Sequence, residues 1–384
     1  MCALLGLAAC AGAPPVEEPP PTPVHELVPA DPGQFGERPD IPTPEEIHRL
    51  DPEQRAAFLR FIKDPIRSTT PRHRRVFEYL QRITQDFHFR GDTLMAADAI
   101  AQGSGNCLSL AIVTTALARL ANVEVGYQLA DDDPVFEFNG NVVKKGVHVR
   151  STLYEPDAPA QTGSFLLRRP SITIDYFPTS RGRFIRNLDE GGYLAMYYRN
   201  IAADAIERED YRTAYWYVLE SLAFAPDNSE GLNMLAVVYG RVGDFDKAEQ
   251  IYVHGLERAD EKLSLLKNYR SLLLRLDRHE EAREIERQLA RIDDPSPYHW
   301  FQLARSAYEN GEYTLAIDYY RRALEIAPYL HEGYLGLAQA YYQAGRMDRA
   351  ADALKQALEN AERPSTRSLY QAKLQALAAE TLNN

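Results

Sequence analysis

Residues 297–330 read PYHWFQLARSAYENGEYTLAIDYYRRALEIAPYL, and the pattern of this stretch recurs at intervals of 34 residues. The positions that define the pattern carry small, large apolar or turn-forming residues: Trp300, Leu303, Gly311, Tyr313, Ala316, Tyr320, Ala323 and Pro328. The next window, 331–364, matches at Tyr334, Leu337, Gly345, Met347, Ala350, Leu354 and Ala357, and window 229–262 matches at Leu232, Leu235, Gly243, Phe245, Ala248 and Tyr252. A fixed period of this length predicts units that stack and bury a core between neighbours.

Five such windows cover residues 195–364 without a gap. Window 195–228 keeps Tyr198, Ile201, Tyr211, Ala214 and Pro226, whereas window 263–296 is degenerate, with Leu273, Ala282 and a His279 at the aromatic position. The spacing resembles the tetratricopeptide repeat, which implies an all-α solenoid that holds a protein or peptide. Residues 365–384 predict a capping helix through Leu369, Leu374 and Leu377. Because each repeat contacts only its neighbours, we expect 195–384 to fold alone.

The preceding part of the chain, 43–190, predicts an α+β domain. Helices are expected to begin at Thr43-Pro44-Glu45-Glu46, a capping box, and at Thr70-Pro71, with a short third helix over 93–101. A helix from Cys107 to about Asn122 follows. Strands are expected over 123–129, at 136–138 and 142–143 around the turn Asn139-Gly140, and at 147–150 and 172–176.

Cys107 is the candidate nucleophile of this domain. It lies in Gly105-Asn106-Cys107-Leu108-Ser109-Leu110, directly ahead of an apolar run that reaches Ala118. At the first turn of a helix, free N–H groups and the positive helix end stabilise a thiolate. His148 and Asp175 follow in strand-like segments, and each alternates with apolar neighbours. If both project from the face on which the Cys107 helix packs, they can act as base and orienting acid.

The segment around Cys107 resembles the transglutaminase-like branch of the papain-like cysteine enzymes. The resemblance covers about 70–180 and rests on the Cys107 motif, Asn122-Val123-Glu124-Val125, His148 in Val-His-Val and Asp175 in Ile-Thr-Ile-Asp. It implies Cys107 as nucleophile, His148 as base and Asp175 as orienting residue. Asp157 or Glu155 could serve in place of Asp175. The backbone N–H of Cys107 is the expected oxyanion donor.

The N-terminal residues resemble an export signal. Residues 1–10 are apolar and end in Leu7-Ala8-Ala9-Cys10, similar to a bacterial lipobox in which Cys10 would carry lipid. Residues 11–42 are rich in proline and predict an extended spacer. A lipid on Cys10 and a following Ala11 would place the protein in the bacterial envelope, on the periplasmic face of the outer membrane.

Composition excludes some functions. The net charge of −12 and the lack of a basic cluster argue against nucleic acid, and neither metal-ligand spacing nor a phosphate loop predicts a cofactor. The sequence therefore predicts a lipid-anchored cysteine hydrolase or acyltransferase, protease- or amidase-like, whose repeats hold a protein substrate. The alternative is an envelope scaffold without catalysis, in which the repeats bind a partner protein.

Overall fold

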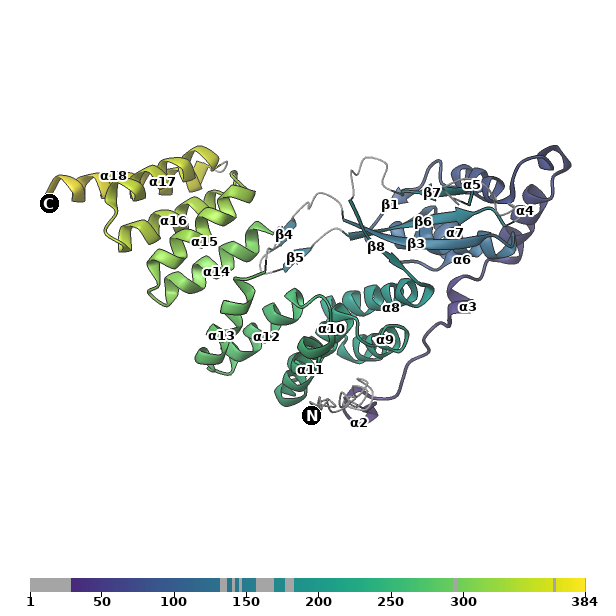
Figure 1. The fold of residues 1–384 in the computed structure, drawn as a ribbon, viewed down its shortest axis with the longest axis horizontal. Coiled ribbons are helices and arrows are strands. Elements are labelled where there is room, and N and C mark those ends of the chain that lie inside the picture. The colour runs from purple at the N-terminus through teal and green to yellow at the C-terminus, as the bar shows by residue number, and fades with distance from the viewer. Residues whose placement is uncertain are drawn as a thin grey trace, which may run out of the picture.

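The computed structural model describes residues 29–131, 137–139, 142–144, 147–156, 169–176, 183–292, 296–361 and 364–383. These residues form an elongated molecule, with a sheet and its helices at one end and a curved array of helices at the other (Figure 1). The expected combination of an α+β region and a helical repeat region is therefore present.

The sheet has four strands in the order β7 (Ser171–Ile174), β6 (Val147–Tyr154), β3 (Glu124–Asp131) and β8 (Arg183–Leu188), and every neighbouring pair is antiparallel. Helix α7 (Cys107–Leu120) packs on β6 and β3. All of its residues from 108 to 118 are buried, as the continuous apolar run predicts. The helix therefore forms the centre of this part of the core.

Shorter elements complete the part of the chain before the repeats. They are α3 (Pro44–Ile47), α4 (Pro52–Ile62), a 3-10 turn (Pro65–Arg67), α5 (Arg72–Ile83), α6 (Ala96–Gln102), the parallel pair β1 (His88–Phe89) and β2 (Ser104–Gly105), and the hairpin strands β4 (Glu137–Asn139) and β5 (Val142–Lys144). The capping box at Thr43 is confirmed, because Thr43 and Glu46 cap each other. The expected hairpin is confirmed by the pairing of Asn139 with Val142, although Asn139 was expected in the turn and is the last residue of β4; Gly140 lies outside the described residues.

The repeat region consists of helix pairs at regular spacing. The pairs are α8 (Glu190–Glu207) with α9 (Tyr211–Phe224), α10 (Ser229–Val242) with α11 (Phe245–Arg258), α12 (Leu263–Arg275) with α13 (His279–Leu289), α14 (Pro297–Glu309) with α15 (Tyr313–Ile326), and α16 (His331–Gln343) with α17 (Met347–Asn360). The first helices at 229, 263, 297 and 331 begin where the 34-residue windows begin. The prediction of helical repeats is therefore confirmed, the degenerate window included.

Helix α18 (Pro364–Asn383) packs against α17 at the end of the array. Leu377 is buried there, but Leu369 is 52% exposed. Tyr370 is buried in its place and hydrogen bonds through its hydroxyl to Nδ1 of His331 at 2.9 Å. The apolar pattern thus predicted a packed helix but named one wrong contact residue.

Helix α8 belongs to both ends of the molecule. Its Tyr193 is fully buried and stacks on Tyr127 of β3 at a centroid distance of 4.2 Å. The Tyr193 hydroxyl also lies 3.2 Å from Nε2 of His48. Burial lowers the pKa of His48 to about 4, so the ring is neutral and can accept this hydrogen bond. One apolar core consequently runs from the sheet into the first repeats.

Residues 31–42 cross the first repeats, whereas 11–42 were expected to form an extended spacer; residues 11–28 lie outside the described residues. We call residues 31–42 the strap. It contains the short helix α2 (Pro32–Phe35), and Phe35 is buried and stacked on Tyr215 of α9 at 3.9 Å. Proline-rich composition predicts an extended chain. It does not predict that Phe35 within the segment packs into the core of the first repeats.

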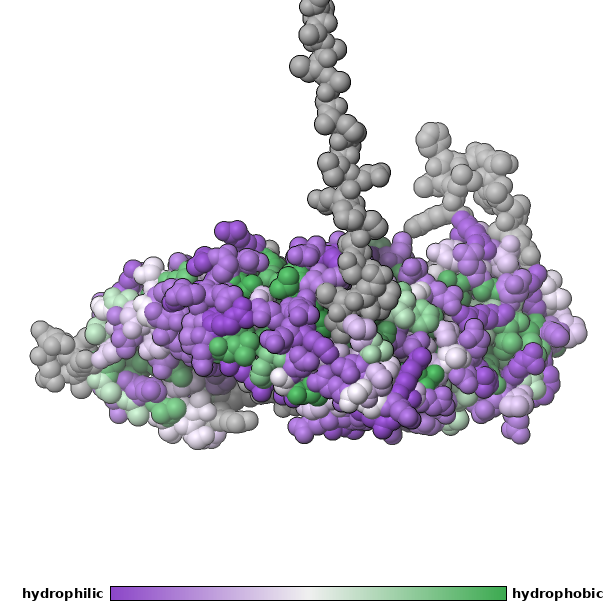
Figure 2. Space-filling view, turned by 90° about the horizontal axis from the view of Figure 1, so that it is seen from below, coloured by the Kyte–Doolittle hydropathy of each residue, from purple (hydrophilic) through white to green (hydrophobic). Residues whose placement is uncertain are grey.

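The surface is mainly polar. On the face shown in Figure 2, hydrophilic residues dominate and hydrophobic residues form separate patches. Among the described residues, no helix is both long and apolar enough to cross a bilayer.

Candidate functional site

The first candidate site is the beginning of α7. Cys107 is the first helical residue and is partly buried. Asn106 caps the helix by accepting a hydrogen bond from the Ser109 N–H at 2.9 Å, and Ser109 Oγ accepts one from the Asn106 N–H at 3.3 Å. This reciprocal cap holds the thiol at the positive end of a 14-residue helix, as expected from the sequence.

A hydrogen-bond chain links this cap to the repeats. The side-chain amide of Asn106 donates to Thr93 Oγ1 at 2.6 Å, and Asn200 of α8 donates to the same oxygen at 2.9 Å. Gly105 precedes the cap with φ +145°, and a Cβ there would lie 2.7 Å from the Ser109 side chain. The glycine is thus required by close packing against the cap, and α8 helps to position the Cys107 turn.

Asp175 follows β7 and is bound by Arg150, whose Nε donates to Asp175 Oδ2 at 2.6 Å. The face of the sheet that packs on α7 carries Tyr127 and Ser151, because Tyr127 reaches Thr115 and Ser151 reaches Tyr176 beside Thr114. Arg150 alternates with Ser151 along β6, so the Asp175–Arg150 pair lies on the opposite face. The triad hypothesis requires Asp175 to project from the face that α7 covers.

His148 lies in β6, where its backbone pairs with Ala130 of β3. Its side chain lies outside the described residues, and so does Asp157. The catalytic grouping of Cys107, His148 and Asp175 therefore stays a prediction.

Tyr176 and the alternative acid Glu155 are two further polar residues of this region. Burial is the main cause that raises the pKa of Tyr176, and Cys107 contributes electrostatically, so this phenol lies within electrostatic range of the thiol. Glu155, the alternative acid, contacts Nδ1 of His73 in α5, and both side chains are mostly buried. His73 precedes Cys107 in the chain, and its contact with Glu155 joins α5 to the end of β6.

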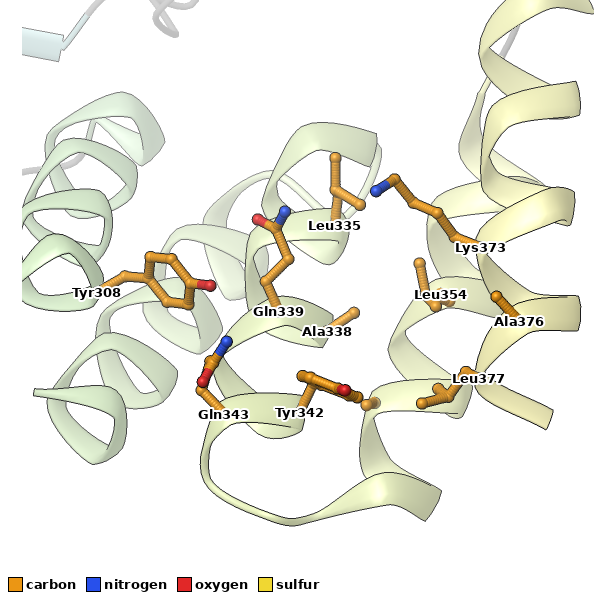
Figure 3. Close-up of a pocket in the computed structure, with 11 residues that line it drawn as sticks. Tyr308, Leu335, Ala338, Gln339, Tyr342, Gln343, Leu354, Lys373, Ala376 and Leu377 are labelled. Carbon is orange, nitrogen blue, oxygen red and sulfur yellow. The ribbon is translucent and has the colours of Figure 1, made fainter. Parts of the chain in front are cut away.

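The second candidate site is a pocket in the last repeats, with a cavity volume of about 350 Å³ (Figure 3). Helices α14, α16, α17 and α18 contribute its lining: Tyr308, Leu335, Ala338, Gln339, Tyr342, Gln343, Ala350, Leu354, Lys373, Ala376 and Leu377. Its floor is apolar and buried at Ala338, Leu354 and Leu377. Its rim carries amides, phenols and one ammonium group. The pocket as a whole can therefore bind both apolar and polar groups of a ligand.

The pocket occupies equivalent positions of successive repeats. Tyr308 and Tyr342 are 34 residues apart and both line it. Gln339 and Gln343 correspond to Arg305 and Glu309 of the preceding repeat, which form an ion pair at 3.4 Å. The exchange of a charged pair for two amides marks this repeat as different. Comparing the windows position by position shows this exchange in the sequence, although not the pocket itself.

Among the described residues, no group of three or more His, Cys, Asp or Glu side chains is placed to hold a metal ion.

Comparison with known families decides the nature of the array. Family models described as tetratricopeptide repeat match residues 217–250, 271–331 and 307–377. The C-terminal part of this chain consists of tetratricopeptide repeats. The matched residues begin in α9 and end in α18, so they include the pocket.

Solved structures show a limited likeness. "Crystal structure of MamA protein" is 21% identical, with a TM-score of 0.36, and the match covers 44% of this chain and 92% of that one. The Pseudomonas aeruginosa PilF structure is 17% identical with a TM-score of 0.41, covering 50% and 88%. YrrB, titled a TPR protein with an unusual peptide-binding site, is 14% identical with a TM-score of 0.37, covering 46% and 92%. No curated protein matched the chain.

Proposed function

We propose that this protein is a scaffold whose tetratricopeptide array binds a segment of a partner protein. The observation that carries the proposal is the pocket at equivalent positions of the last two repeats, with an apolar floor and a polar rim. Arrays of stacked repeats present extended surfaces, and peptide sites combine apolar pockets with a few polar groups. A pocket of this size accommodates a few side chains of a partner and not a whole domain.

Selection of a random peptide library on the full chain tests this function. We expect enriched peptides whose binding, measured by fluorescence polarisation, weakens at least tenfold in Ala376→Phe, because the new ring fills the pocket. Ala372→Phe, one turn earlier on α18 and outside the lining, is the matched control. A selection that enriches no peptide would contradict the proposed scaffold function.

We also propose a transglutaminase-like activity at Cys107, as a cysteine hydrolase or acyltransferase. Its support is the partly buried thiol at the capped start of α7, together with the sequence resemblance around it. Cys107 would attack an amide carbonyl, and His148 would protonate the leaving amine. Asp175 would orient His148 from the sheet face opposite α7, where it also pairs with Arg150. Water or an amine would then release the acyl group from sulfur, which regenerates the thiol.

An activated Cys107 is expected to react with iodoacetamide well below pH 8.5, the approximate pKa of a free thiol. Mass spectrometry of the Cys107 peptide measures its rate separately from those of Cys2 and Cys10. His148→Ala should slow the reaction near pH 6.5, because an imidazolium would no longer stabilise the thiolate. Equal rates in wild type, His148→Ala and a free cysteine peptide would argue against this activity.

We propose that Cys10 carries lipid and holds the protein on the periplasmic face of a bacterial outer membrane. The support is Leu7-Ala8-Ala9-Cys10 followed by Ala11. Buried acyl chains contribute about 0.8 kcal/mol per methylene, so the lipid would dominate membrane association. Membrane fractionation of wild type against Cys10→Ala, both produced with an export signal, tests it; equal association of the two would contradict it.

A further inference from the structure

Lys373 is the one charged residue among those that line the pocket of the last repeats. It extends from α18, and Figure 3 shows its ammonium end directed across the pocket toward Leu335 of α16. Among the described residues, Lys373 forms neither an ion pair nor a hydrogen bond. Its side chain is exposed, so a bound group could reach the ammonium without displacing a partner that the structure describes.

The local charge around this lysine differs from that of the whole chain. Residues 331–384 contain six acidic residues and six basic ones, so this segment has no net charge, whereas the whole chain carries −12. In the equivalent positions of the preceding repeat, Glu309 contributes a carboxylate that Gln343 does not. A carboxylate arriving at this pocket therefore meets one nearby cation and no lining anion.

Besides a carboxylate, the ligand needs an apolar group, because the floor of the pocket is apolar. Leu335, Ala338, Leu354 and Leu377 come from three helices and form one side of the pocket, and Gln339 and Gln343 stand at the rim (Figure 3). Burying an aliphatic side chain of a ligand against such a floor contributes roughly 1.5–3 kcal/mol. The rim amides can hydrogen bond to a peptide backbone in either direction, since an amide both donates and accepts.

We infer that the pocket selects a partner segment in which an aliphatic side chain stands next to, or within two residues of, a carboxylate. The aliphatic side chain of the partner lies on the apolar floor of the pocket, and its carboxylate pairs with Lys373. Gln339 or Gln343 hydrogen bonds to the partner backbone between these two side chains. A basic segment is disfavoured because its ammonium would meet Lys373 across a partly desolvated space. A polyanion such as nucleic acid is disfavoured too, because one lysine cannot match a row of phosphates. This inference rests on the proposed scaffold function and specifies the partner for it.

The test uses full-length protein and the peptides enriched by the library selection. We expect most enriched peptides to combine Leu, Ile or Val with a nearby Asp or Glu. Lys373→Glu should weaken these peptides at least tenfold, and a peptide with its acid replaced by lysine should bind Lys373→Glu more tightly than wild type. Lys355→Glu is the matched control, because Lys355 is an exposed lysine on α17 that pairs with Asp352 and does not line the pocket. Thermal melting of each variant checks its folding.

The outcomes separate this inference from the function on which it rests. Enriched peptides that lack an acid, or that bind wild type and Lys373→Glu equally, would overturn the partner chemistry and leave the scaffold function standing. A selection that enriches no peptide would overturn both. Equal weakening by Lys373→Glu and Lys355→Glu would show a general charge effect and would also overturn the assignment to Lys373.

Discussion

Residues 195–384 expressed alone are expected to aggregate or stay largely unfolded, whereas the chain from Ala30 onward should melt cooperatively. The 34-residue register by itself predicts the opposite, because each repeat should need only its neighbours. The structure changes this expectation at α8, the first helix of the array. It begins at Glu190, before the first window, and its residues Tyr193, Leu194 and Tyr198 are buried.

The physical reason is the size of the surface that the truncation exposes. It deletes Tyr193, which stacks on Tyr127, and it removes the strap that covers Tyr215 and receives the Tyr198 hydroxyl through Pro42. Tyr198 and Tyr215 remain in the fragment and lose this cover, and both are fully buried in the whole chain. Exposing each large buried side chain costs roughly 1.5–3 kcal/mol, so these two losses cost about 3–6 kcal/mol. That overlaps the lower end of the stability of a typical domain, about 5–15 kcal/mol.

Far-UV circular dichroism and size-exclusion chromatography measure the result. The chain from Ala30 onward is the control, because it keeps the strap, the sheet and every contact described above. A monomeric 195–384 fragment with full helix content and a cooperative melt would show that the sheet and strap do not support the array. In that case the contacts of Tyr193 would contribute less than their burial indicates.

The repeat helices could be predicted because their determinants are local. Small and aromatic residues at fixed offsets, with Gly243, Gly311 and Gly345 at positive φ in the turns, place the helix boundaries without reference to the rest of the chain. His279 at an aromatic position did not disturb this, because it begins α13 with an exposed side chain. The degenerate window is therefore irregular in sequence but not in backbone.

The contacts between distant segments could not be predicted in the same way. The triad hypothesis requires Asp175 on the face covered by α7, but alternation along one strand cannot say which face a helix covers. The pairing of Ser151 with Ile174 and the bond from Tyr176 to Thr114 decide it, and they involve three separate segments. Likewise, Lys373 and Tyr308 are 65 residues apart, so their shared pocket follows from the curvature of the array and not from a motif.

The strap is the clearest example, because composition marks residues 11–42 as a spacer while the structure anchors 31–42 through specific bonds. Trp216 Nε1 donates to the Gly36 carbonyl at 3.2 Å, and Arg212 donates to the Glu37 carbonyl at 2.9 Å. Gly36 has φ +70°, and a Cβ there would lie 3.3 Å from Arg212, so glycine suits both the turn and the contact. Lys247 pairs with Asp31 at 2.9 Å. These bonds fix the strap across α9 and α11.

Phe35→Ala is consequently expected to lower the free energy of unfolding by about 3 kcal/mol, the lower end for truncating a buried phenylalanine. Phe35 is only 3% exposed, stacks on Tyr215 and meets the edge of Tyr239 at 5.2 Å. Loss of the ring leaves a cavity and uncovers two tyrosines that belong to the first repeats. Urea unfolding followed by circular dichroism measures the change.

Glu37→Ala is the matched control, since the strap uses the Glu37 carbonyl and the side chain is exposed. We expect its stability to stay within about 0.5 kcal/mol of wild type, as for most surface substitutions. If Phe35→Ala and Glu37→Ala behave alike, the strap rests on the array without stabilising it. If only Phe35→Ala destabilises, then a segment with the composition of a linker acts as part of the core, because one aromatic side chain is enough to convert an extended chain into a packed element.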